Sequence, residues 1–88
     1  MRFSLPALEL RDVTGVLELH GFELANSVGS IQTWVGSIEG DHRIVQLDVT
    51  DAPFSYWSQV LRAAIRNSGI PRRIFYWEAK KPLPWGVL

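Results

Sequence analysis

The chain has 88 residues, of which 47% are hydrophobic and 20% are charged, so it suits one small globular domain and is too apolar for a disordered segment. It has no cysteine and no uninterrupted run of 18 apolar residues, so we expect neither a disulfide framework nor a membrane-spanning helix. The formal net charge is zero, so the chain as a whole is not strongly basic.

The charges are unevenly divided between the two parts of the chain. Residues 1–51 carry three arginines against eight carboxylates, a net charge of −5, whereas residues 52–88 carry six basic side chains against Glu78 alone, a net charge of +5. This division predicts either a bipolar surface with a basic side open to an anionic partner, or two ends that neutralise each other in the fold.

The first predicted element is an amphipathic helix over residues 8–20. Apolar side chains recur there at spacings of three and four, and the pattern ends with His20 beside Gly21. Glycine is a common helix stop because it adopts the left-handed conformation without a Cβ clash. We expect His20 to be partly buried or to lie at the helix C-terminus, where a cation is favoured.

Three antiparallel strands are predicted next, over residues 22–26, 30–37 and 43–50. Each alternates apolar and polar side chains, and a polar turn at residues 39–42 separates the last two. In the third strand one face is wholly apolar and should face the core; it consists of Val45, Leu47 and Val49. The pattern does not determine which face of the sheet carries Trp34, because it does not set the register between strands.

A second helix is predicted after the strands, capped by Asp51 or Ser55 and ended near Gly69. Its apolar stripe comprises Trp57, Val60, Leu61, Ala64 and Ile65, so Trp57 is expected in the core. Arg62 and Arg66 fall on the opposite, solvent side.

The segment over residues 72–80 is ambiguous among strand, helix and irregular structure. Its aromatic composition suits a strand, but Pro71 before it and Pro82 after it are helix start and stop signals, which favour a short helix or an irregular segment. Residues 78–88 are expected to form an extended, proline-containing tail. We therefore predict a single α+β domain over residues 1–88, with the order α-β-β-β-α, an antiparallel three-stranded sheet and two helices on one face.

Two segments, "HGFELANSVGS" and "LRAAIRNSGI", give the chain a resemblance to the HicA toxins of toxin–antitoxin systems, over residues 10–75. The resemblance implies a fold like that of a double-stranded RNA-binding domain and an mRNA-cleaving ribonuclease neutralised by a protein antitoxin. It also implies a catalytic histidine directly after the Gly-Ser pair, and this chain has Ile31 at that position.

Isoleucine cannot transfer a proton, so we predict no catalysis of the family type. Ile31 is expected to be a packing position on its strand. His42 is a weak alternative catalytic or phosphate-binding candidate and is otherwise a solvated turn residue. With only two histidines and no cysteine, the sequence predicts no metal site and no cofactor.

The binding candidates are the aromatic and basic side chains of the second half of the chain, together with one strand tryptophan: Arg62, Arg66, Arg72, Arg73, Lys80, Lys81, Trp34, Tyr76, Trp77 and Trp85. Basic groups contact phosphate and aromatic rings stack on unpaired bases, which is how single-stranded RNA is held. Tryptophan, tyrosine and arginine are also enriched at protein–protein hot spots. Alternatively, several of these aromatic residues complete the core.

The sequence thus leaves two functions open. The favoured one is a non-enzymatic, cytoplasmic binding module on a HicA-like scaffold, which contacts an antitoxin-like protein or a second copy of itself, in a toxin–antitoxin, defence or mobile-element system. The alternative is a divergent HicA-like RNA-binding protein or ribonuclease toxin. No membrane partner is expected.

Overall fold

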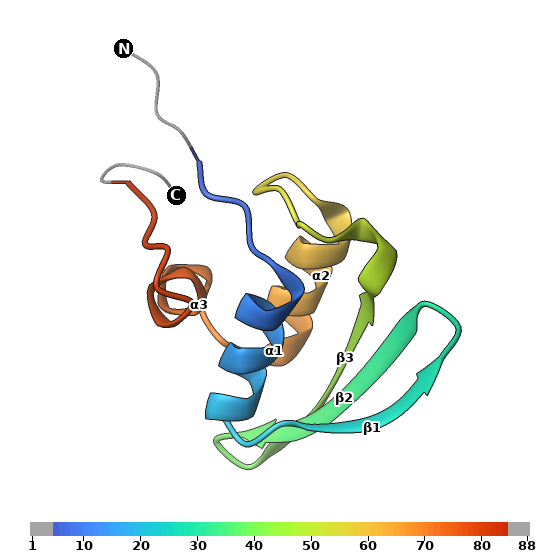
Figure 1. Cartoon of the computed structure of the whole chain (residues 1–88). Helices are drawn as coiled ribbons and strands as arrows, with labels where there is room; N and C mark the ends of the chain where they lie inside the picture. The colour runs from blue at the N-terminus through green and yellow to red at the C-terminus, as the bar shows by residue number, and fades with distance from the viewer. Residues whose placement is uncertain (1–4, 85–88) are drawn as a thin grey trace.

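The computed structural model describes residues 5–84 and shows an α+β fold (Figure 1). The elements follow in the order α1 (Leu10–Leu19), β1 (Glu23–Val28), β2 (Ile31–Ile38), β3 (Asp41–Asp48), the 3-10 turn η1 (Val49–Asp51), α2 (Gln59–Ser68) and α3 (Arg72–Glu78). The sheet is antiparallel with strand order β1-β2-β3, and α1 and α2 lie over one of its faces. This confirms the predicted arrangement of two helices on a three-stranded sheet.

Two tight hairpins set the register of the sheet. Val28 pairs with Ile31 across the turn at Gly29 and Ser30, and Ile38 pairs with Asp41 across Glu39 and Gly40. Both residues of the second turn have positive φ, as a type I′ hairpin requires.

The predicted strand limits were displaced by a few residues. β1 ends at Val28 rather than at residue 26, because the turn to β2 needs only Gly29 and Ser30; the pairing is irregular between Leu24 and Asn26. β3 begins at Asp41 rather than at residue 43, because the turn needs only two residues. Val49 lies in η1 rather than in the strand.

The sheet has a core face and an open face. Trp34 pairs with Val45 across β2 and β3, and both side chains are buried against the helices together with Leu47. Phe22 lies so close to Gly36 that a Cβ there would fall 2.7 Å from the ring. On the open face, Ile44 is 52% exposed.

The predicted cap of the second helix was wrong. α2 begins after Ser58, whose hydroxyl accepts a 3.1 Å hydrogen bond from the Leu61 backbone N–H. Asp51 lies instead in η1. Since the helix starts only at Gln59, Trp57 precedes it and does not join its buried stripe.

The predicted position of His20 at the end of the first helix is confirmed. The segment whose structure the sequence left ambiguous contains the short helix α3. His20 is the C-cap of α1, and its Nε2 lies 2.5 Å from the Glu78 carboxylate at the end of α3. Lys81 donates a 2.6 Å hydrogen bond from its ammonium group to Asp12 in α1. Two polar contacts thus hold α1 against the end of α3 and the segment that follows. Residues 81–84 have no regular secondary structure.

Candidate functional site

The position of the family's catalytic histidine lies at the start of β2. Ile31 there is 37% exposed, so it is partly covered on its strand but does not belong to the buried core. Its partner across the sheet is Asp48. Hydrogen bonds from the Thr50 hydroxyl and backbone N–H, and from Ser30, hold the pKa of Asp48 below its usual range. Asp48 is therefore an ionised carboxylate that caps η1, which does not suit it to proton transfer near neutral pH.

His42 lies at the far end of the same strand pair. It faces Ser37 across β2 and β3, whereas Ile31 faces Asp48, which is six residues away along β3. At about 3.3 Å per residue, that separation is roughly 20 Å. His42 is an exposed strand residue rather than a turn residue. It does not replace a group missing at position 31.

Trp34 and Tyr76 are core residues and not surface contacts. Trp34 is 6% exposed, and its indole N–H donates a 3.0 Å hydrogen bond to the Gln32 side chain. Tyr76 is 1% exposed, and burial raises the pKa of its hydroxyl to about 12. The prediction of both as partner-binding residues was wrong, because the apolar faces of β2 and α3 point inward.

Three of the six predicted basic residues meet in one cleft, which we call the arginine cleft. It has a volume of about 390 Å³ and is lined by Arg62, Ile65, Arg66, Gly69, Ile70, Pro71 and Arg72. The turn between α2 and α3 creates it. Gly69 adopts the left-handed conformation that ends α2, and the buried Ser68 hydroxyl donates to the Ile65 carbonyl and accepts from the Ile70 N–H. Only three residues therefore separate the end of α2 from the start of α3.

The remaining basic residues lie elsewhere. Lys81 is engaged with Asp12, and this contact lowers the pKa of Asp12 although partial burial of that carboxyl opposes the shift. Arg73 lines a different pocket, beside Trp77. Lys80 lines a third pocket, which also includes Trp77. The six residues therefore do not form one continuous phosphate track.

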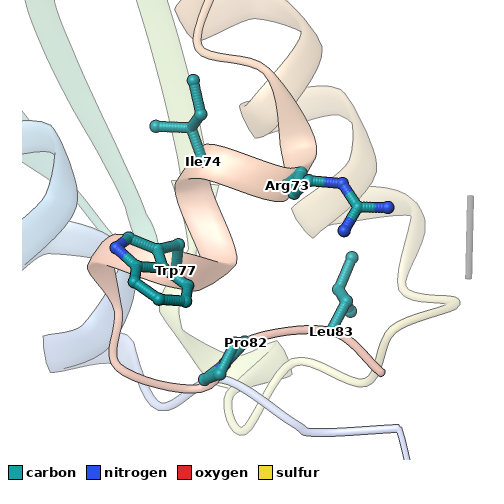
Figure 2. A pocket seen from close by; sticks show the side chains of 5 residues that line it. All are labelled: Arg73, Ile74, Trp77, Pro82 and Leu83. Carbon is teal, nitrogen blue, oxygen red and sulfur yellow. The ribbon is translucent and has the colours of Figure 1, made fainter. Parts of the chain in front are cut away.

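Trp77 is the most exposed large hydrophobic side chain of α3, at 69%. Figure 2 shows its indole extending from α3 toward the segment that carries Pro82, with Leu83 across the pocket near Arg73. This pocket has a volume of about 370 Å³ and is also lined by Ile74. A second pocket of about 410 Å³ shares Trp77 and Pro82 and is lined further by Leu19, Glu78 and Lys80. We call the two pockets together the Trp77 surface.

The other two tryptophans of the C-terminal half were predicted as a binding residue, Trp85, and a core residue, Trp57. Trp85 lies outside the described residues. Trp57, which was expected in the core, is 68% exposed. Sequence reasoning missed it as a surface residue because it matches the helical period of α2. The Ser58 immediately after it was the one signal for a later helix start.

Among residues 5–84 there is no group of three histidine, aspartate or glutamate side chains that could hold a metal ion. No helix in this range is long and apolar enough to cross a membrane. In comparisons with known proteins, no family model, curated protein or solved structure matched the chain. The resemblance to HicA toxins stays a prediction.

Proposed function

We propose that the chain is a non-enzymatic binding module on a HicA-like scaffold, which contacts a protein partner through the Trp77 surface in the cytoplasm. The observation that carries this proposal is the placement of Trp77, which is 69% exposed between two pockets that contain Leu19, Ile74 and Leu83. An exposed tryptophan beside apolar pockets is a common hot spot of protein interfaces, because its large ring buries much area with little loss of conformational freedom.

The charges around the Trp77 surface favour a different protein over a second copy of this chain. Arg73 lines one of the two pockets beside Trp77, and Lys80 lines the other. Glu78 lines the same pocket as Lys80, but its carboxylate contacts His20. In a symmetric dimer each copy would place the same basic residues near those of the other, which is unfavourable. The partner segment should therefore combine a large apolar side chain with nearby aspartate or glutamate.

Selection from a displayed peptide library tests this proposal. We expect peptides enriched on the immobilised protein to pair a large apolar residue with acidic neighbours and to lose binding to Trp77→Ala. Trp57→Ala is the matched control, because Trp57 is equally exposed but lies outside both pockets. Selected peptides that bind wild type and Trp77→Ala equally would rule out this surface.

The non-enzymatic part of the proposal has a separate test. Ile31 offers no titratable group, and the nearby Asp48 is engaged as a cap. Purified protein incubated with a long mRNA should leave it intact, and its expression should not arrest growth. Cleavage that copurifies with the protein and disappears in His42→Ala would show instead that another group has taken over the chemistry.

A further inference from the structure

The exposed Trp57 lies beside the arginine cleft, and one tyrosine connects the two. The ring of Tyr56 packs edge-to-face against Trp57 with 4.7 Å between centroids. Tyr56 is itself 7% exposed, so it is a core residue that supports an exposed one. The indole of Trp57 is thus held at the surface by a fixed neighbour, and it presents most of its area to solvent.

The same tyrosine also holds Arg72. The Arg72 Nη1 donates a 2.7 Å hydrogen bond to the Tyr56 hydroxyl, and its guanidinium lies 5.0 Å from the centre of the ring. Arg72 is therefore positioned before any ligand arrives. A pre-ordered guanidinium loses less conformational freedom when it binds an anion.

The arginine cleft carries positive charge without a matching carboxylate. Its described lining contains no acidic residue, and neither does the smaller hollow beside it on α2, which is lined by Gln59, Arg62, Ala63 and Arg66. The side chains of Arg62 and Arg66 make no hydrogen bond or ion pair with any described residue. They are one helical turn apart, where like charges repel.

Arg43 adds a further charge behind the cleft wall. A Cβ on Gly69, which lines the cleft, would lie 3.1 Å from the Arg43 guanidinium. The Nε of Arg43 is buried and has no hydrogen-bond partner among the described residues. The C-terminal end of α2 supplies only about half a negative charge, which does not balance these guanidinium groups. An anion that carries more than one negative charge would balance them.

We propose that this face binds single-stranded nucleic acid, with successive phosphodiester groups on Arg62, Arg66 and Arg72 and an unpaired base stacked on Trp57. Guanidinium forks match phosphate oxygens, and a tryptophan face holds a base of any sequence. An acidic peptide would also use the arginines, so competition by such a peptide is one outcome of the test. The site is separate from the Trp77 surface, so this inference does not depend on the proposed protein partner.

Fluorescence anisotropy with a labelled uridine oligonucleotide of about 12 residues tests the proposal. We expect Trp57→Ala to weaken binding about five- to a hundredfold, the cost of losing one stacked base. Arg62→Ala with Arg66→Ala should weaken binding and reduce its salt dependence between about 50 and 200 mM salt. Trp77→Ala should leave the affinity unchanged. Circular dichroism establishes that each variant is folded.

Several results would overturn the proposal. One is undetectable binding of the oligonucleotide at low salt. Another is a Trp57→Ala variant that binds the oligonucleotide as tightly as wild type, together with complete displacement of the oligonucleotide by a poly-glutamate peptide. That pair of results would assign the cleft to acidic protein segments. Displacement by millimolar inorganic phosphate would indicate a simple anion site. A DNA oligonucleotide of the same length, run in parallel, distinguishes an RNA requirement from recognition of phosphates and bases common to both nucleic acids.

Discussion

At the scale of single residues, the described tryptophans divide into one structural residue and two exposed ones. Trp34 is 6% exposed, whereas Trp57 and Trp77 are 68% and 69% exposed. The difference follows from their placement, since Trp34 points from the middle strand into the core and the other two lie on helix ends or faces that no element covers. Only the latter are available to a partner.

Substitution of these residues should separate stability from binding. Trp34→Ala leaves a large cavity between the sheet and the helices, so we expect it to lower the free energy of unfolding by about 3–5 kcal/mol. Trp77→Ala should change it by less than about 0.5 kcal/mol, because little of its area is buried. Urea unfolding followed by circular dichroism measures both. Similar losses in the two variants would contradict the assigned environments.

At the scale of the elements, two glycines have opposite roles. Gly36 lies on the core face of β2, where a Cβ would fall 2.7 Å from the buried ring of Phe22. The absence of a side chain there lets the segment between α1 and β1 pack onto the sheet. Gly15 lies inside α1, and a Cβ at this position would meet nothing within 4 Å. Gly15 therefore weakens its helix without a packing reason.

We expect alanine at these two positions to shift stability in opposite directions. Gly36→Ala should destabilise the protein by about 1–3 kcal/mol, because Phe22 or the strand must move. Gly15→Ala should stabilise it by up to about 1 kcal/mol through the higher helix propensity of alanine. Thermal unfolding of both variants checks the pair. A stabilised Gly36→Ala would show that Phe22 has another position open to it.

At the scale of the whole molecule, the C-terminal segment is tied back to the first helix. Lys81 contacts Asp12, and Glu78 contacts His20. These contacts bring together residues more than fifty positions apart, and the Asp12–Lys81 pair joins a carboxylate from the first half of the chain to an ammonium group from the second. Part of the predicted charge asymmetry is thus neutralised within the fold, while the arginine cleft keeps its charge.

Acid should weaken the tie between Asp12 and Lys81. The pKa of Asp12 lies below its ordinary value of 3.8, because the hydrogen bonds from Lys81 and the Glu9 backbone together outweigh the opposing effect of burial. A lowered folded-state pKa means that this stabilisation is fully present above pH 3.8 and is lost as the pH falls through the folded-state value. Asp12→Asn should therefore be less stable than wild type at neutral pH, and the difference should narrow in acid. A difference that does not change with pH would refute this role of the ion pair.

The architecture was predictable because its signals are local. Apolar periodicity marked the helices, and alternation with glycine turns marked the strands. The environment of Trp57 was not predictable, since the helical period continues through a residue that precedes the Ser58 cap. The sheet face that carries Trp34 could not be predicted, because only its pairing with Val45 determines that face. The arginine cleft could not be predicted, because it forms at a corner of three residues between α2 and α3. The absence of Lys81 from the cleft could not be predicted either, because it follows from a contact with Asp12, 69 residues away.

The most direct test of the proposed function is a heteronuclear NMR titration of the labelled protein with a peptide selected as described above. Each tryptophan gives one indole N–H signal, and Trp77→Phe identifies that of Trp77. We predict that the peptide shifts the Trp77 signal and backbone signals of α3, and leaves the buried Trp34 signal unchanged. Shifts confined to the open face of the sheet, with the Trp77 signal unmoved, would contradict the assignment of the Trp77 surface as the partner site.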